Sequence, residues 1–122
     1  WQNLPAMIQA RWGHCVVELD NKIYAIGGYD GKKFFSSVER YATSDGWKFV
    51  NSLNVERHAA GAVTLNGKIY IMGGCNGKSQ SLKSVECYNL DLETWTSRRD
   101  MKICHSSPGV TVQKGYIYVV SR

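Results

Sequence analysis

Short apolar stretches alternate with clusters of turn-forming residues along the whole chain. In the first half, the stretches cover residues 15–19, 23–26, 37–41 and 47–51, with Asp, Asn, Gly and Ser between them. Runs of this length that are rich in Val, Ile, Tyr and Trp predict β-strands. Asn66-Gly67 between two such runs is typical of a tight hairpin turn. No window keeps apolar residues at helical spacing over three turns, so the pattern predicts an all-β protein made of four-stranded antiparallel units.

The same pattern returns with a period of about 47 residues. Ile-Tyr-Ala-Ile-Gly-Gly at residues 23–28 returns as Ile-Tyr-Ile-Met-Gly-Gly at 69–74, and Val-Glu-Arg-Tyr at 38–41 returns as Val-Glu-Cys-Tyr at 85–88. A third round begins with Ile-Tyr-Val-Val at 117–120. A repeat of this period indicates units that are stacked or arranged in a ring, because one such unit cannot bury its apolar face alone.

Each repeat combines a pair of glycines with large aromatic residues. A glycine pair at the end of an apolar strand lets the backbone of a neighbouring unit approach closely, and it allows positive φ in the turn that follows. We expect this at the crowded inner strands of a ring. Tyr and Trp near the end of each unit have the surface to fill the wider gap between adjacent sheets.

The order of these residues resembles the Kelch repeat of β-propellers. In each full unit a double Gly is followed by Val-Glu-x-Tyr and then, six or seven residues later, by Trp. Arg11 and Arg57 stand where the family has an Arg that opens the first strand. The third unit departs from the pattern, with His105 in place of that Arg and Ser121-Arg122 in place of the glycine pair. The resemblance implies β-propeller blades of four antiparallel strands.

In this interpretation the chain is a partial propeller of about 2.6 blades. Residues 1–10 are predicted to hold the last strand of a preceding blade, at Trp1 to Leu4, and residues 105–122 the first two strands of a further blade. Two complete Kelch blades lie between them, at 11–56 and 57–104. Closed propellers have about 4–8 blades, so we expect either a piece of a longer chain or partial propellers that assemble with one another.

The composition favours a globular intracellular protein. Apolar residues make up 43% of the chain, as is usual for a globular domain, and no apolar run approaches the ~18 residues of a membrane span. The cysteines form no Cys-x-x-Cys pair, which favours free thiols in a reducing compartment: they are Cys15, Cys75, Cys87 and Cys104. We expect a cytoplasmic location, with the cytoskeleton as the alternative.

The chain carries 15 basic and 10 acidic residues, a formal net charge of +5. These scattered charges fit either an ordinary solvated surface or a loop face that attracts an acidic protein partner. The basic residues expected on that face are Lys32, Lys33, Arg57, Lys78 and Lys102. No motif of a nucleic-acid reader accompanies the charge, so we predict neither a nucleic-acid nor a membrane partner.

Sequence signals for catalysis, metals or cofactors are weak. Residues 73–79 look like a phosphate-binding loop, but Met72 stands where that motif needs its first Gly, and a strand rather than a helix is expected to follow. His14, expected inside a strand, His58 and His105 occupy three different repeat positions, which argues against one shared metal. We predict a non-enzymatic protein with no catalytic residue, metal or cofactor. A propeller enzyme, of which galactose oxidase is an example, is the minority alternative.

The resemblance also implies which loop residues contact a partner. In Kelch proteins that act as substrate receptors, three positions in each blade commonly do so: the residue after the double Gly, one a few residues further on, and the residue after the opening Arg. On this chain the first position gives Tyr29 and Cys75, the second Phe34 and Gln80, and the third Trp12, His58 and Ser106. With Lys32, Lys33 and Arg57, they form the predicted partner surface. Phe35, which matches Leu82 of the next unit, is expected to pack on its own blade.

Two protein-binding functions follow from the resemblance. The first is a BTB–Kelch adaptor, in which the propeller binds a substrate protein and a BTB domain elsewhere in the parent chain binds a cullin-type ubiquitin ligase. The second is an actin-binding or actin-crosslinking Kelch protein, whose basic loops suit the acidic surface of the filament. In both cases the expected partner is a protein.

Overall fold

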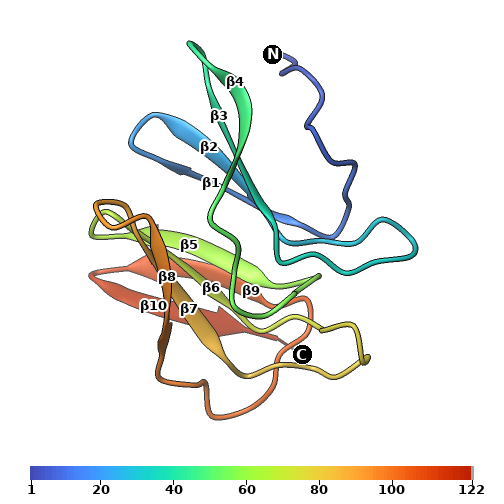
Figure 1. Cartoon of the computed structure of the whole chain (residues 1–122). Coiled ribbons are helices and arrows are strands. Elements are labelled where there is room, and N and C mark those ends of the chain that lie inside the picture. The colour runs from blue at the N-terminus through green and yellow to red at the C-terminus, as the bar shows by residue number, and fades with distance from the viewer. Residues whose placement is uncertain (122) are drawn as a thin grey trace.

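The computed structural model describes residues 1–121, and Arg122 lies outside the described residues. This part of the chain holds ten strands and no helix, in three antiparallel sheets (Figure 1). The sheets are formed by β1 (Cys15–Leu19), β2 (Lys22–Ile26), β3 (Val38–Ala42) and β4 (Gly46–Val50); by β5 (Gly61–Leu65), β6 (Lys68–Met72), β7 (Val85–Asn89) and β8 (Thr94–Arg98); and by β9 (Gly109–Gln113) and β10 (Tyr116–Val120). The all-β prediction is confirmed. Over residues 1–121, no helix is long and apolar enough to cross a membrane.

Each four-stranded sheet is a meander in which every strand pairs with the one before it. The register repeats as well, because Tyr41 lies opposite Trp47 in the first sheet and Tyr88 opposite Trp95 in the second. The first strands of the three sheets are neighbours, with β1 beside β5 and β5 beside β9. The sheets therefore stack with their first strands on one side, as blades around an axis do.

The apolar core fills the space between the first two sheets. The rings of Tyr24 in β2 and Tyr88 in β7 are both fully buried, and their centroids lie 5.7 Å apart. Trp95 packs in the same core and donates its Nε1–H to the carbonyl of Asn51 at 2.9 Å. Aromatic residues thus bridge neighbouring sheets, as the repeat predicted. Phe35 is buried, in agreement with packing on its own blade.

The double glycines lie where neighbouring sheets come closest. Gly27 and Gly73 have φ values of 69° and 70°. A Cβ atom on Gly27 would lie 2.5 Å from the carbonyl oxygen of Arg57, and one on Gly73 would lie 2.5 Å from that of His105. Each of these oxygens belongs to the connection that leads into the next sheet. The positive φ and the close backbone approach predicted for the glycine pairs are therefore both confirmed.

A buried ion pair anchors each of the first two blades to the connection that enters it. Arg11 Nη2 lies 2.8 Å from Glu39 Oε2, and Arg57 Nη2 lies 3.2 Å from Glu86 Oε2. The carboxylates also accept backbone N–H groups from the entering connection: those of Ile8 and Gln9 for Glu39, and those of Asn54 and Val55 for Glu86. These hydrogen bonds and the paired arginines compensate the cost of burying the two carboxylates.

Two local expectations differ from the structure. Residues 1–10 form no strand, although one was expected at Trp1 to Leu4. A strand needs backbone hydrogen bonds to a neighbouring strand, and this segment is held by side chains instead, with Trp47 Nε1 donating to the Pro5 carbonyl at 2.8 Å. His14 precedes β1 rather than lying inside it. The unit boundaries at residues 11, 57 and 105 fall outside the strands and stay a prediction.

Candidate partner-binding surface

The loops that follow the double glycines meet the segments that precede β1 and β5 at one end of the sheets. Trp12 and Tyr29 exchange two backbone hydrogen bonds, of 2.9 and 3.0 Å, and Tyr29 pairs in turn with Phe34. Equivalent pairings in the second blade join three residues: His58, Cys75 and Ser81. These short pairings continue each blade beyond its main sheet, so they fix side chains at equivalent positions in the two blades.

Four of the predicted residues form one aromatic cluster: Trp12, Tyr29, Phe34 and His58. The Tyr29 and Phe34 rings stack with centroids 4.4 Å apart, and Trp12 meets Tyr29 edge-on at 5.0 Å. His58, from the connection into the second blade, lies edge-on to Phe34 at 5.0 Å and to Trp12 at 6.2 Å. Trp12 is 57% exposed, whereas the other three side chains are half-buried. The aromatic cluster therefore presents one large side chain to solvent.

The loop between Tyr29 and Phe34 is ordered by its own hydrogen bonds. Asp30 Oδ1 accepts the backbone N–H of Lys32 at 2.8 Å and that of Lys33 at 2.7 Å, and the Tyr29 hydroxyl donates to the Gly31 carbonyl at 2.9 Å. The N–H of Lys33, followed by that of Lys32, holds the pKa of the Asp30 carboxyl below its ordinary value. Both lysine side chains are exposed, so the loop offers two positive charges beside the aromatic cluster.

The structure places Ser81, and not Gln80, at the equivalent of Phe34. Cys75 pairs with Ser81, as the corresponding residues pair in the first blade. The second loop is one residue longer, and the extra residue is taken up in its turn, where Asn76 Oδ1 accepts the N–H of Gln80 at 3.2 Å. The expected position of Gln80 is therefore corrected by one residue.

The second-blade part of the surface is small and polar. Cys75 Sγ lies 3.2 Å from Ser106 Oγ, and the Cys75 backbone pairs with that of His58. Cys75 is half-buried, whereas Ser106 and Ser81 are exposed. The surface thus changes from the aromatic cluster to hydroxyl and thiol groups, which come from the loop of the second blade and from the connection into the third sheet.

Arg57 does not belong to this surface. It is 1% exposed, and its Nη1 donates to the carbonyls of Gly73 and Ser84 at 3.0 Å each. Burial lowers the pKa of Arg57, and the Glu86 carboxylate opposes that shift. The opening Arg of the two full repeats therefore stabilises the blade, and the expectation that Arg57 lies on the basic loop face is corrected.

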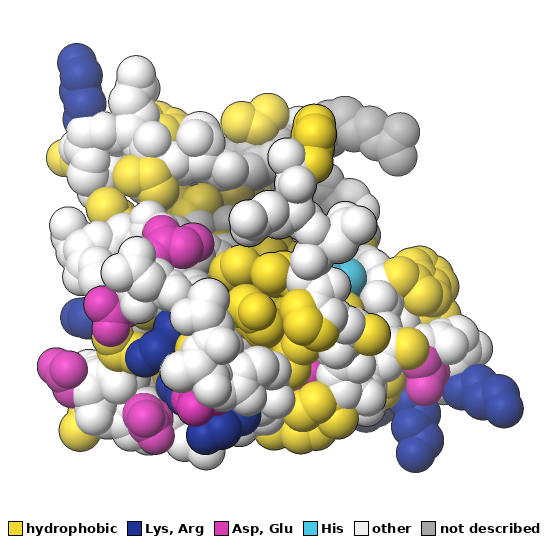
Figure 2. All heavy atoms as spheres, turned by 90° about the horizontal axis from the view of Figure 1, so that it is seen from above, with side chains coloured by type: hydrophobic (Ala, Val, Ile, Leu, Met, Phe, Trp, Pro, Cys, Tyr) yellow, Lys and Arg dark blue, Asp and Glu magenta, His cyan; other side chains and the backbone are white. Residues whose placement is uncertain are grey.

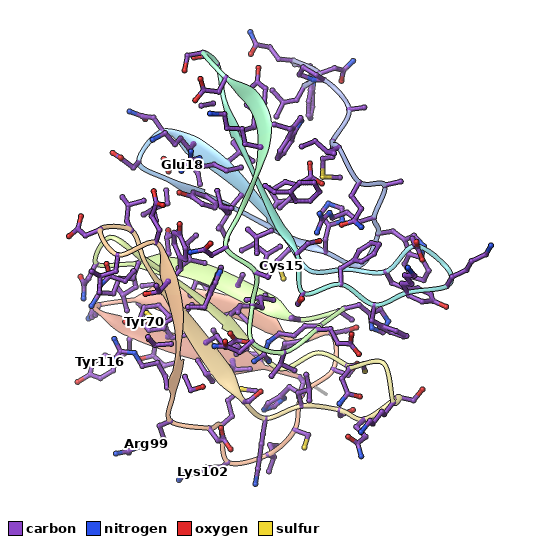
Figure 3. All side chains as sticks on the ribbon, in the orientation of Figure 1. Cys15, Glu18, Tyr70, Arg99, Lys102 and Tyr116 are labelled. Atoms are coloured by element: carbon purple, nitrogen blue, oxygen red, sulfur yellow. The ribbon has the colours of Figure 1, made fainter. Side chains whose placement is uncertain are left out.

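The four lysines expected on the loop face are all exposed: Lys32, Lys33, Lys78 and Lys102. Figure 3 shows Lys102 and Arg99 at the connection between β8 and β9, pointing away from the sheets. The loop that carries Lys32 and Lys33 projects from another side of the molecule, beyond β2 and β3 (Figure 1). Lys102 is therefore separate from the aromatic cluster.

Glu56 is a residue of this surface that the sequence did not indicate. Its Oε1 accepts the N–H of Gly77 at 3.0 Å, which ties the loop of the second blade to the connection between the blades. A Cβ atom on Gly77 would lie 3.5 Å from Phe34 Cδ1, so the same loop borders the aromatic cluster. The preceding repeat has Ala10 at the equivalent position, and no repeated pattern therefore pointed to Glu56.

Residues 1–121 contain no group of three or more His, Cys, Asp or Glu side chains placed to hold a metal ion, and no pocket is found among them. Burial, and then the charge of Arg11, lowers the pKa of His14. Burial raises the pKa of the Cys15 thiol to about 12, which keeps it in the unreactive protonated form.

Four-stranded meanders that stack with their first strands on one side define the class of this protein, which is a β-propeller built from blades. A sequence model of the Kelch motif matches residues 10–54 and 56–102. The chain therefore belongs to the Kelch-repeat family.

Two proteins named Kelch-like match this chain over all or most of its length. Human Kelch-like protein 11 is 29% identical over 124 residues, which cover 100% of this chain and 17% of that protein. Human Kelch-like protein 28 is 40% identical over 105 residues, which cover 79% of this chain and 18% of that protein. The chain thus spans less than a fifth of the length of these two relatives.

Two solved structures have the same fold. The structure of YjhT has a TM-score of 0.79 and 18% sequence identity, covering 95% of this chain and 35% of the YjhT chain. A fungal alcohol oxidase of the AA5 family, in complex with copper, has a TM-score of 0.78 and 16% identity, covering 89% of this chain and 27% of its own. At these identities the similarity concerns the fold alone.

Proposed function

We propose that these blades belong to a propeller that binds a protein partner through the loop surface around the aromatic cluster. The observation that carries the proposal is that Trp12 is 57% exposed while two aromatic rings, those of Tyr29 and His58, and two backbone hydrogen bonds hold it in place. Tryptophan fixed at an interface often contributes ~2 kcal/mol or more to binding. A rigid and exposed Trp is therefore well suited to anchor a partner.

Packing within the propeller gives no reason for a large side chain at this position. The equivalents of Trp12 are His58 in the second blade and Ser106 in the third. A position that accepts Trp, His and Ser in successive blades does not need bulk to stabilise the fold. The size of Trp12 is therefore better explained by binding than by blade packing.

In the parent protein, the propeller is the substrate receptor of a cullin-type ubiquitin ligase, and a BTB domain elsewhere in that chain binds the cullin. The protein acts in the cytoplasm and is not an enzyme. Membership of the Kelch-repeat family and the exposed side chain of Trp12 support this role. The exposed side chains of Lys32 and Lys33 favour a second candidate, binding to the acidic surface of actin filaments.

Affinity purification of the full-length parent protein from its own cells, with partners quantified by mass spectrometry, tests these roles. Trp12→Ala should weaken partner binding by about 1 kcal/mol or more, and change the melting temperature little. The matched control is Leu92→Ala, since Leu92 is an exposed apolar residue in the turn between β7 and β8.

Each result identifies one role. A cullin that co-purifies with wild type and both variants, together with a second protein lost only from Trp12→Ala, supports the receptor function. Actin in place of a cullin supports filament binding. Loss of thermal stability in Trp12→Ala would show that Trp12 packs between blades, and partners retained by that variant would remove the binding role.

A further inference from the structure

We propose that Asn66 is a site of spontaneous deamidation, whereas Asn76 is protected from the same reaction by the loop that holds it. The proposal concerns a covalent modification by water, and it is independent of the proposed protein-binding function.

The chain contains the tripeptide Asn-Gly-Lys twice, at residues 66–68 and 76–78. Asparagine followed by glycine is especially prone to deamidation, because glycine has no side chain to shield its backbone nitrogen. Both asparagines are followed by the same two residues, so an unfolded chain should modify them at similar rates. A difference between them in the folded protein therefore measures the effect of structure.

The reaction closes a ring on the asparagine side chain. The backbone nitrogen of the glycine loses its proton and bonds to Cγ of the asparagine, and the side-chain nitrogen leaves with a proton as ammonia. Water then opens this succinimide ring at one of its two carbonyl carbons. Opening at Cγ gives aspartate, and opening at the main-chain carbonyl gives isoaspartate. Because the ring forms within one chain, its rate depends on how easily the two groups can meet.

The fold leaves the reacting groups accessible at Asn66. Asn66 and Gly67 form the exposed turn between β5 and β6, with φ values of 53° and 73°. Within residues 1–121, no hydrogen bond holds the Asn66 side chain or the Gly67 N–H. A Cβ atom on Gly67 would meet nothing within 4 Å, so there is space for the ring. The turn has to leave its left-handed conformation for the ring to close, and local opening at an exposed tip costs little.

The side-chain amide of Asn76 is instead fixed by three hydrogen bonds. Its Oδ1 accepts the backbone N–H groups of Lys78 at 2.9 Å and Gln80 at 3.2 Å, and its Nδ2 donates to Gln80 Oε1 at 3.2 Å. Two backbone hydrogen bonds of 3.1 Å close the loop, from Asn76 N–H to the Gln80 carbonyl and from Ser79 N–H to the Asn76 carbonyl. The amide therefore has to break several contacts before it can react with Gly77.

The attacking nitrogen of Gly77 is held as well. Its N–H donates to Glu56 Oε1 at 3.0 Å. This bond stabilises the protonated nitrogen, and the negative charge of the carboxylate opposes the anion that forms when the proton is lost. Glu56 belongs to the connection between β4 and β5. The protection of Asn76 therefore depends on contact between this connection and the loop of the second blade.

Modification of Asn66 acts at the end of the blades opposite the partner surface, because β6 runs from this turn to the double glycine (Figure 1). Aspartate adds a negative charge there and tolerates the left-handed conformation of the turn. Isoaspartate lengthens the main chain by one carbon atom. A two-residue turn cannot take up that atom without disturbing the pairing of Leu65 with Lys68.

Ageing of the full-length parent protein near neutral pH, followed by tryptic digestion and mass spectrometry, tests the proposal. Trypsin cuts after Arg57, Lys68 and Lys78, so residues 58–68 and 69–78 are released as separate peptides with one asparagine each. Asn66 should deamidate at least about tenfold faster than Asn76, since the hydrogen bonds of Asn76 have to break first. In protein kept unfolded in guanidinium, the two rates should become similar, because the tripeptides are the same.

Glu56→Ala tests the protection of Asn76 directly, and Glu56→Gln is its matched control. Alanine removes the acceptor of the Gly77 N–H, so deamidation of Asn76 should accelerate at least about fivefold. Glutamine keeps an oxygen that can accept this N–H, and the acceleration should be smaller. The rate at Asn66 should stay as in wild type in both variants, and their melting temperatures check that both are folded.

Three results would overturn the proposal. Equal rates at the two asparagines of the folded protein would show that structure does not separate them. Faster modification of Asn76 would show that Glu56 acts as a base on Gly77 instead of protecting it. An unmodified Asn66 would show that the hairpin turn is too rigid for the ring to close. An unchanged rate at Asn76 in Glu56→Ala would overturn the role of Glu56.

Discussion

Arg57 shows how much the stability of a blade depends on one buried charge. Its guanidinium is held by Glu86 and by two carbonyl oxygens, and neither side chain of the ion pair reaches solvent to more than 2%. A buried pair of this kind adds less stability than its contacts suggest, because both ions lose their hydration. Removing one partner is far more costly than the pair is favourable, since the other charge stays buried alone.

We therefore expect Arg57→Ala to lower the free energy of unfolding by about 3–5 kcal/mol, as the Glu86 carboxylate is left without its counterion. Lys48→Ala is the matched control: Lys48 lies 3.7 Å from Asp45, and both side chains are exposed. Its loss should cost less than about 1 kcal/mol. Urea denaturation of both variants measures the difference, and equal midpoints would contradict a structural role for Arg57.

Among the elements, the glycine pairs at the ends of β2 and β6 determine how closely two blades approach each other. Gly73 and Gly67 have nearly the same φ, 70° and 73°. A Cβ atom on Gly73 would meet the His105 carbonyl at 2.5 Å, whereas one on Gly67 would meet nothing within 4 Å. The two glycines thus separate the conformational role of glycine from its role in close packing.

Gly67→Ala should cost about 1–2 kcal/mol, the penalty for a Cβ in the left-handed region. Gly73→Ala should cost more than that, because the same penalty is joined by a clash with backbone that cannot move without shifting the third sheet. Thermal unfolding of the two variants tests this order. If both lose the same stability, the approach of the blades is loose enough to accept a methyl group.

The strands could be predicted from the sequence because the residues that determine them recur in each repeat. Strand bounds, glycine pairs and interblade aromatics recur at fixed spacing, so each occurrence supports the other. The position of Gln80 failed because one extra residue can be absorbed anywhere in a turn, and only the backbone pairing of Cys75 with Ser81 shows where. Arg57 was expected at the surface because a charge is usually solvated, and the sequence does not display its contact with Glu86 across 29 residues.

The whole molecule is held together by faces shared between blades. Tyr24 is fully buried between the first two sheets, whereas its equivalent Tyr118 in the third sheet is 47% exposed. Figure 2, viewed from the side of the N-terminal segment and the first blade, shows apolar side chains gathered in the middle of that face and charged ones toward its margin. The exposed apolar residues of the N-terminal segment and the first blade include Ile8, Val16 and Phe49. Faces of this kind mark surfaces that another part of a protein covers.

Because the first two blades share a core, they should unfold together. Tyr88→Ala in β7 should cost about 3–5 kcal/mol, as is typical for the loss of a buried aromatic ring. Hydrogen exchange should then speed up in β2 of the first blade as well as in β6 and β7, since Tyr88 packs on Tyr24. Faster exchange confined to the second blade would show that the blades are independent.

Tyr88→Phe is the control for this experiment. The Tyr88 hydroxyl is buried without a hydrogen-bond partner among the described residues, and burial raises its pKa to about 12. Removing an unpaired buried hydroxyl should leave stability unchanged or slightly higher. A marked loss in Tyr88→Phe would indicate a partner for the hydroxyl.

The anchoring carboxylates have a consequence for how such proteins change over evolution. The Glu39 carboxylate accepts the backbone N–H groups of residues 8 and 9, which belong to the preceding unit. The repeat that contains Glu39 ends with Asn54 and Val55, and their backbone N–H groups donate to Glu86 of the following unit. One repeat length of about 47 residues thus encodes both an acceptor for its predecessor and donors for its successor. After a repeat is duplicated or deleted, the repeats on either side still carry a matching acceptor carboxylate and donor N–H groups. A gene of this kind can therefore gain or lose whole blades without compensating mutations at the junctions.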